Sequence, residues 1–189
     1  MNRCPWTGTD ELYVRYHDEE WGTPVHDDRK HFEFLVLESA QAGLSWSTIL
    51  KKRDNYRRAY DYFDAGRVAE YDEKKVEHLL LDEGIVRNRR KIASSINNAG
   101  CFLAIQRDYG SFDSYIWGFV DHSPVVNRWK HMSEIPAKTP LSDRISMELK
   151  GKGFTFIGST IIYAHLQAIG IVNDHLVTCF RYEQLCASY

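Results

Sequence analysis

The chain has 189 residues, 43% of them hydrophobic, which is enough to fill the core of one large or two small domains. No apolar run reaches about 18 residues and the N-terminus lacks the apolar segment of a secretory signal, so we expect a cytoplasmic protein without a membrane partner. The formal net charge of −2 argues against binding a polyanion through overall charge. The four cysteines are widely spaced, which favours reduced thiols or metal ligands over disulfides.

The first half of the sequence predicts five helices. Helical spacing of Leu12, Tyr13 and Tyr16 indicates the first of them, with Thr9 or Asp10 as its cap. The five predicted ranges are 10–20, 28–42, 46–58, 64–68 and 72–82. Gly84 ends the fifth helix.

The second half continues in the same pattern. Asn88 can cap a long helix that Tyr109-Gly110-Ser111 breaks, and further helices are predicted over 112–120, 142–150 and 161–169. Asn173 can cap a last helix, while residues 121–140 form a long connection. Because no stretch alternates apolar and polar residues long enough for a sheet, we predict an all-α fold. We expect one compact unit over residues 1–189, which could comprise two helical lobes. The first would contain 1–63 and 111–189, and the second 64–110.

A corner between the second and third helices combines a carboxylate with an indole. Glu38 follows an apolar stretch of helix, so a buried charge there would require a specific donor. Gly43 stops the helix and Ser45 can cap the next one, which begins at Trp46. The corner presents Gln41, Gly43 and Leu44 outwards, and its parts suit a flat, nitrogen-rich ring. An inert helix junction with a core tryptophan is the alternative.

Basic residues gather in two short tracts that hold nine of the 24 in the chain. The second tract follows Gly84 in a helix, a tight connection and a second helix. Cations are unfavourable at a helix N-terminus, so their presence there indicates an anion such as a DNA phosphate. An ordinary αα-turn and a solvated helix face are the alternatives. The two tracts comprise Lys51, Lys52, Arg53, Arg57 and Arg58, and Arg87, Arg89, Arg90 and Lys91.

Two pairs of residues could bind one metal ion. His175 and Cys179 stand at i and i+4 of the predicted last helix, on one face. Cys4 and His17 would complete a structural Cys2His2 zinc site that joins the two ends of the chain. Spacing alone is a weak signal, because other histidines and cysteines are available: His26, His31, His165, Cys101 and Cys186.

Three strings carry a resemblance to a known family. They are YHDEEWG at 16–22, LESAQAGLSW at 37–46, and GFTFIG at 153–158, which continues to VNDH at 172–175. Together they closely resemble the bacterial 3-methyladenine DNA glycosylase I family, over nearly the whole chain from Cys4 to Cys179. The resemblance implies an all-α helix-hairpin-helix DNA glycosylase fold, with structural zinc on Cys4, His17, His175 and Cys179.

The resemblance also implies roles for individual residues. Glu38 and Tyr16 would bind the damaged base, and Trp46, Trp6, Tyr13 and Trp21 would form stacking walls. Gly43 and Leu44 would lie at the gap in the DNA, and with Gln41 and the hairpin residues Gly84, Arg87, Arg89 and Lys91 they form the expected DNA contacts. The hairpin has a single glycine, unlike the paired glycines of many relatives.

We therefore expect a monofunctional glycosylase that flips 3-methyladenine out of double-stranded alkylated DNA and hydrolyses its N-glycosidic bond. We expect a monomer with zinc and no organic cofactor. No general base is named, and Lys91 leaves a lyase reaction open. The alternatives are a noncatalytic zinc-stabilised DNA-binding module, a zinc hydrolase, and a glycosylase with a broader range of alkylated bases.

Overall fold

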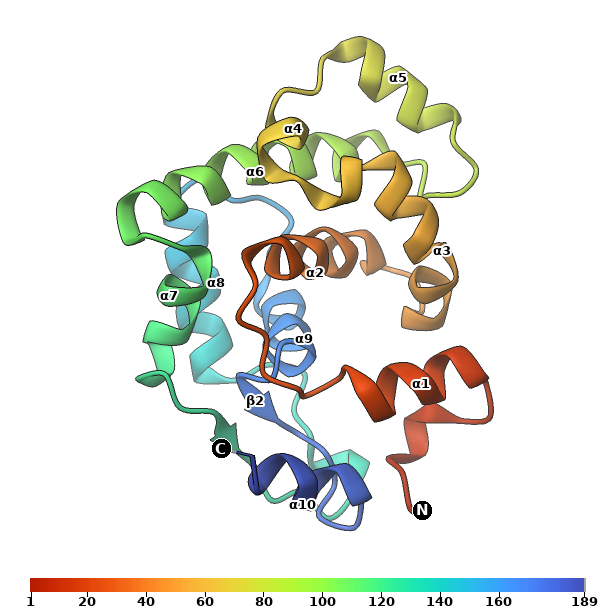
Figure 1. Cartoon of the computed structure of the whole chain (residues 1–189), viewed down its shortest axis with the longest axis vertical. Helices are drawn as coiled ribbons and strands as arrows, with labels where there is room; N and C mark the ends of the chain where they lie inside the picture. Colours follow the sequence, from red (N-terminus) through yellow and green to blue (C-terminus); the bar gives the residue numbers. More distant parts are fainter. Residues whose placement is uncertain (189) are drawn as a thin grey trace.

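The computed structural model describes residues 1–188, most of which are helical (Figure 1). Helix α2 lies in the middle of the molecule and packs against α3, α6, α7 and α9. The helices are α1 (Glu11–Glu19), α2 (Asp28–Gln41), α3 (Trp46–Ala59), α4 (Ala65–Ala69), α5 (Glu73–Leu81), α6 (Arg89–Tyr109), α7 (Phe112–Trp117), α8 (Pro140–Gly151), α9 (Ser159–Ala168) and α10 (Phe180–Cys186). Four short 3-10 helices are η1 (Pro5–Thr7), η2 (Asp61–Phe63), η3 (Gly118–Val120) and η4 (Met132–Glu134).

Four of the predicted helix caps are confirmed. Asp10 accepts hydrogen bonds from two amides of the first turn of α1, and Ser45 accepts from the amide of Thr48 at the start of α3. Asp64 and Asn88 cap α4 and α6 in the same way. These short polar side chains satisfy first-turn amides that have no partner within the helix.

The prediction of a fold without strands is wrong in one place. Strands β1 (Val125–Val126) and β2 (Val172–Asn173) form a two-residue parallel pair. Two-residue strands are too short to show an alternating pattern, so the sequence held no signal for them. Their amides bond across the pair, with Val125 N donating to Ile171 O at 2.8 Å.

The predicted last helix is also wrong in its position. Asn173 belongs to β2, and α10 begins only at Phe180, so His175 lies in a loop and Cys179 is the residue before the helix. The buried side chain of Asn173 accepts a hydrogen bond from the amide of His175, which turns the chain after the strand. The two residues still reach one site, but they do so through this loop and not through helical spacing.

Helix α2 is buried on all sides, because every residue from His31 to Ala40 is shielded from solvent. A helix that is covered all round forms the centre of a core. The N-terminal arm meets the start of α10 in the lower part of Figure 1, where Phe180 N donates to Asn2 O at 3.0 Å. The division into two lobes stays a prediction.

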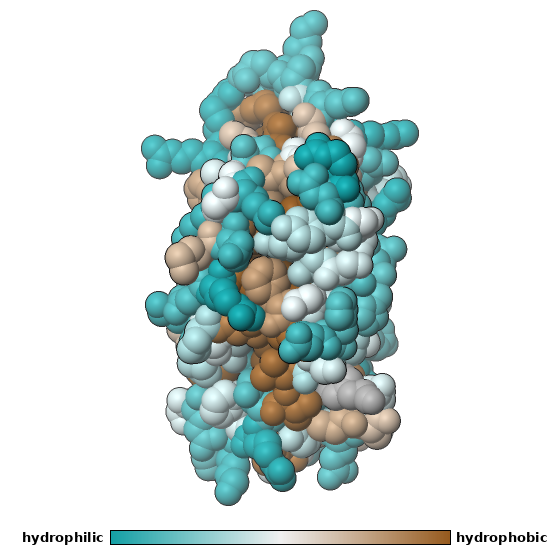
Figure 2. Space-filling view, turned by 90° about the vertical axis from the view of Figure 1, so that its left-hand side faces the viewer, coloured by the Kyte–Doolittle hydropathy of each residue, from teal (hydrophilic) through white to brown (hydrophobic). Residues whose placement is uncertain are grey.

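The face in Figure 2 is mostly hydrophilic, with apolar side chains gathered in a narrow vertical band. Across residues 1–188, no helix has both the length and the hydropathy required to span a membrane.

Candidate active site and metal cluster

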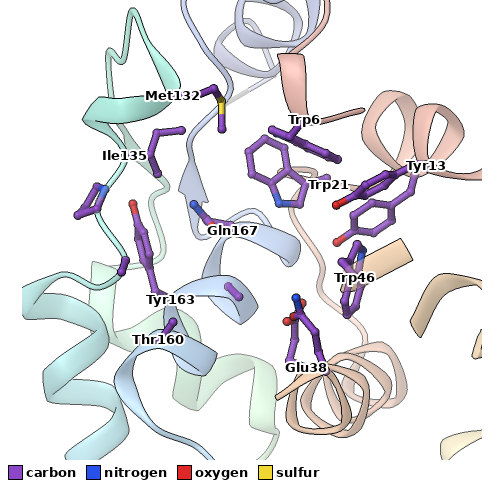
Figure 3. Close-up of a pocket in the computed structure, with 15 residues that line it drawn as sticks. Trp6, Tyr13, Trp21, Glu38, Trp46, Met132, Ile135, Thr160, Tyr163 and Gln167 are labelled. Atoms are coloured by element: carbon purple, nitrogen blue, oxygen red, sulfur yellow. The ribbon is translucent and has the colours of Figure 1, made fainter. Parts of the chain in front are cut away.

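A cavity of about 320 Å³ lies between the N-terminal aromatic residues and α9 (Figure 3). Glu38 and Gln41 of α2 line it, and Glu38 points into it between the two walls. The first wall contains the five aromatic residues singled out from the sequence: Trp6, Tyr13, Tyr16, Trp21 and Trp46. The second wall was not anticipated and contains Met132, Ile135, Pro136 and Ala137 from the connection, with Thr160, Tyr163, Ala164 and Gln167 from α9.

The aromatic wall is a packed assembly. The Trp6 ring centroid lies 5.0 Å from those of both Tyr13 and Trp21, and Tyr16 lies 5.5 Å from Trp46. These separations are typical of tilted and edge-to-face aromatic pairs, which stabilise one another beyond simple burial. The wall can therefore present fixed ring faces to a ligand.

Glu38 has no hydrogen-bond partner on the protein within residues 1–188, although only 4% of the residue is exposed. The donor expected from the sequence is thus not present. Burial instead raises the pKa of Glu38 to about 8, because water no longer stabilises the charged form. The carboxyl group remains available to a molecule that enters the cavity.

The Tyr16 hydroxyl lies in similar surroundings. Burial and the nearby Glu38 raise the pKa of Tyr16 well above its ordinary value, so the phenol stays protonated. Beside it, the indole Nε1 of Trp46 is buried and has no hydrogen-bond partner in the described structure. The cavity therefore combines ring faces with polar groups that the protein itself does not satisfy.

The second wall is fixed by a buried carboxylate. Asp174 is fully buried and accepts hydrogen bonds from the Tyr163 hydroxyl and, at 2.7 Å, from the side-chain amide of Gln167. It also accepts from Asn127 and Trp129 of the long connection, both at 2.7 Å. One side chain thus ties α9 to the segment that carries Met132 and Ile135.

A cluster of four buried residues lies behind the aromatic wall and could hold a metal ion. Their ligand atoms lie within 4.8 Å of one another. Cys179 Sγ is 3.4 Å from His17 Nε2 and 3.5 Å from His175 Nδ1, which is 3.7 Å from Cys4 Sγ. A tetrahedral zinc site with ordinary bond lengths places its ligand atoms about 3.3–3.8 Å apart, and these three separations fall within that range.

The other nitrogen of each histidine has a partner that orients the ring. His17 Nδ1 lies 2.8 Å from Asp18 Oδ1, and His175 Nε2 lies 2.9 Å from the Trp21 carbonyl oxygen. Such partners direct the remaining nitrogen of a histidine towards a metal. Trp21 also packs on the His175 ring at 4.6 Å, so the cluster supports the aromatic wall directly.

Comparison with known proteins agrees with this geometry. The model of the methyladenine glycosylase family matches residues 6–182. The chain belongs to the methyladenine glycosylase family. It is 48% identical to DNA-3-methyladenine glycosylase 1 of Escherichia coli strain K12 over 182 residues, 96% of this chain and 97% of that one.

Solved structures of glycosylases share the whole fold. A crystal structure of 3-methyladenine DNA glycosylase I superposes with a TM-score of 0.92 at 47% identity, covering 95% of this chain and 98% of the other. A second crystal structure, of a tyrosine-to-phenylalanine variant of a 3-methyladenine DNA glycosylase I in complex with 3-methyladenine, also gives a TM-score of 0.92, at 34% identity over 95% of this chain and 97% of the other.

In this member of the glycosylase family, the corner after α2 ends in an exposed tip. Gly43 has a φ of +80°, a left-handed conformation that glycine adopts without strain, and 42% of Leu44 is exposed. The tip is held from α6, where Lys91 Nζ donates to the carbonyl oxygens of Ala40 and Ala42, at 2.7 Å each. Lys91 thus satisfies the C-terminal carbonyls of α2, a position where the helix dipole favours a cation.

The hairpin between α5 and α6 uses several of its own amides. Gly84 N donates to Asp82 Oδ1 at 2.7 Å and Val86 N donates to the Tyr56 hydroxyl at 3.1 Å. Within the described residues, the amides of Arg87 and of the first turn of α6 at Arg89 and Arg90 have no hydrogen-bond partner. A phosphate contact by Gly84 and Arg87 stays a prediction. Because the amides without partners lie at Arg87 and in the first turn of α6, we expect the phosphate to bind nearer to the start of α6 than to Gly84.

The basic side chains of the hairpin differ in what they contact. Arg89 pairs with Glu73 and Glu77 of α5, and Arg87 lies 3.6 Å from Glu83. No ion pair of Arg90 occurs in residues 1–188. The expected contacts of Arg87 and Arg89 with DNA remain predictions.

Two residues of the first basic tract form ion pairs with acids of the protein interior. Arg53 is buried and forms ion pairs with Glu20 at 2.9 Å and Glu33 at 2.7 Å, which join α3 to α1 and α2. Arg57 also pairs with Glu33, at 2.9 Å. The prediction of a phosphate patch is therefore wrong for Arg53, because its charge is satisfied by carboxylates far away in the sequence.

The sequence did not predict the second wall, the hydrogen bonds that converge on Asp174, or the contact of Lys91 with the carbonyl oxygens at the end of α2. The residues of the wall come from a long connection and from an apolar helix, neither of which carries a distinctive pattern. Asp174 did lie within a string that carries the resemblance, and an acid between apolar segments was the only available signal.

Proposed function

We propose that the protein excises 3-methyladenine from alkylated DNA by hydrolysing the N-glycosidic bond of the damaged nucleotide. The relatives named above are 3-methyladenine DNA glycosylases, and one of them was crystallised with that base. The observation that carries the proposal is Glu38, a buried acid without a protein partner that faces an aromatic cavity.

Methylation at N3 makes adenine cationic, and this cavity suits a flat cation. Indole and phenol faces attract a desolvated cation by about 2 kcal/mol, whereas neutral adenine lacks this attraction. A cationic base also favours the charged form of Glu38, so binding lowers the pKa of that acid from its raised value. We assign Glu38 and Tyr16 to hydrogen bonds with the base, and the rings of Trp46, Trp6, Tyr13 and Trp21 to its stacking.

Hydrolysis requires little acid or base assistance, because the positive charge already weakens the glycosidic bond. The bond breaks towards an oxocarbenium-like sugar, the base leaves as neutral 3-methyladenine, and water adds to the sugar carbon with loss of a proton. No side chain is assigned as general base. The amine of Lys91 is engaged by two main-chain carbonyls, which supports hydrolysis over a Schiff-base lyase reaction.

The target base must leave the duplex to reach Glu38, at a cost of about a few kcal/mol. The exposed Leu44 at the tip can offset this cost by filling the gap, as apolar side chains inserted between bases do. Gln41 and Gly43 lie beside it, and the start of α6 would contact a phosphate and so position the backbone.

We assign the metal cluster to structural zinc. The ion would hold the N-terminal arm and the loop after β2 together and would thereby support the aromatic wall. Four protein ligands leave no open position for a metal-bound water, which argues against a zinc hydrolase.

Release of free base from methylated DNA tests the function. The wild type should release 3-methyladenine in preference to 7-methylguanine, whereas a noncatalytic binding module would release neither and a broad-range glycosylase would release both. Glu38→Gln should lower excision much more than affinity for DNA with an abasic-site analogue. Equal losses of both would contradict the role of Glu38 in base recognition.

A further inference from the structure

The loop between α8 and α9 presents an aromatic side chain in an unusual conformation. Phe156 has a φ of +53°, a left-handed conformation that is rare for bulky residues. Its neighbours Phe154 and Ile157 are buried, yet 39% of Phe156 is exposed. This residue lies in the GFTFIG string, which none of the roles assigned so far explains.

The conformation is imposed by contacts with two other helices. The Thr155 carbonyl oxygen accepts from Ser94 Oγ at 3.1 Å and from Asn98 Nδ2 at 2.9 Å, and Thr155 N donates to Asn98 Oδ1 at 2.8 Å. Ser39 Oγ donates to the Phe156 carbonyl oxygen at 3.1 Å. A strained residue persists only where its surroundings hold it in place, and such residues are concentrated at functional sites.

These contacts hold the main chain of Phe156 against the last turn of α2, which leads into the tip at Leu44. Ser39 lies in the last turn of α2, immediately before the tip, and Ser94 lies one turn after Lys91, which holds the tip. Phe156 is not among the residues that line the cavity, so it cannot stack on a base bound at Glu38. Two exposed apolar side chains, Leu44 and Phe156, therefore flank the C-terminus of α2 outside the cavity.

We propose that Phe156 is a second apolar contact with DNA, which stacks against a base that loses its neighbour when the damaged base flips. This inference rests on the proposed function. An aromatic ring suits the task because every base offers a flat face, so the contact tolerates any sequence around the lesion. The strained, firmly held loop keeps the ring at the surface when no DNA is bound.

The test compares three substitutions at this position with a matched control. Phe156→Ala and Phe156→Asn remove the ring, and Asn tolerates the left-handed conformation; Phe156→Trp keeps an aromatic face. Met147→Ala serves as control, because Met147 is 70% exposed on α8 and has no part in the proposal. The probes are a duplex with a tetrahydrofuran abasic site, the same duplex without it, and free 3-methyladenine.

Phe156→Ala and Phe156→Asn should bind the abasic duplex about 5- to 150-fold more weakly than wild type, the effect of removing one stacking platform. Phe156→Trp and Met147→Ala should bind it like wild type, and all variants should bind free 3-methyladenine equally. A 2-aminopurine opposite the abasic site should be less quenched in the Ala and Asn complexes than in the wild-type complex.

Unchanged affinity of both ring-removing variants for the abasic duplex would overturn the proposal. So would an equal loss for the undamaged duplex, because stacking requires an unstacked base, or a parallel loss of free-base binding, which would indicate a purely structural role. A wild type that binds the abasic duplex but releases no base would instead refute the proposed function.

Discussion

Glu38→Gln should stabilise the protein, and the gain should grow with pH. In the folded protein, burial raises the pKa of Glu38 to about 8 from the 4.5 of an unperturbed carboxyl. The folded state therefore binds a proton more tightly than the unfolded state. The contribution of protonated Glu38 to stability is complete below pH 4.5, falls as pH rises, and is lost above pH 8.

The magnitude follows from the separation of the two pKa values. Each pH unit between them corresponds to about 1.4 kcal/mol, so ionisation of Glu38 lowers the free energy of unfolding of the wild type by about 5 kcal/mol between pH 4.5 and pH 9. About 3 kcal/mol of this loss should already be present at pH 7. Glutamine has nearly the same shape and does not titrate, so the variant should escape the loss.

Urea unfolding of the wild type and of Glu38→Gln at pH 5, 7 and 9 measures the effect. The difference between their free energies of unfolding should increase with pH. Metal binding changes with pH in both proteins alike, so its contribution cancels when the free energy of unfolding of one protein is subtracted from that of the other. Glu33→Gln is the control, because Glu33 is a buried acid on the same helix whose pKa is lowered by Arg53 and its neighbours despite burial. That variant should be destabilised. A Glu38→Gln difference that does not change with pH would refute the reasoning.

Three further predictions follow. Cys179→Ala should release bound zinc and lower the melting temperature, as should a strong chelator added to the wild type; a zinc-free wild type of full stability would contradict the structural site. Lys91→Met should slow single-turnover excision without changing the salt dependence of DNA binding, whereas loss of a phosphate contact would reduce that slope by about 1. Burial, reinforced by His31, depresses the pKa of His165, and neither of its ring nitrogens has a hydrogen-bond partner among residues 1–188. Its contribution to stability is therefore present above pH 6.5 and lost as pH falls below it, so His165→Leu should flatten the fall in urea midpoint between pH 7 and pH 5.

Helix positions and their caps could be read from the sequence because their causes are local. Asp10, Ser45 and Asn88 bond amides two or three residues away, so sequence distance and spatial distance coincide. The resemblance predicted both the family and the residues of the aromatic wall, and in the structure these residues line one cavity.

Prediction failed where partners are distant in the sequence. The chain alone suggested that His175 and Cys179 share a helix, but a buried strand and a loop bring them together. Arg53 was expected to belong to a phosphate patch, whereas the expected contact of Lys91 with DNA stays a prediction. Whether a cation is free depends on which carboxylates or carbonyls the fold places beside it, and here these come from other helices.

The corner from Glu38 to Trp46 shows the same division. Its composition determined by itself where α2 ends, where α3 begins and that an acid would be buried near the end of α2, since propensity, capping and hydrophobicity act over a few residues. Only the tertiary structure decided that Glu38 has no protein donor within the described residues, that Lys91 holds the tip, and that Phe156 is bound to the last turn of α2. These outcomes depend on packing between segments up to 117 residues apart, which no local pattern encodes.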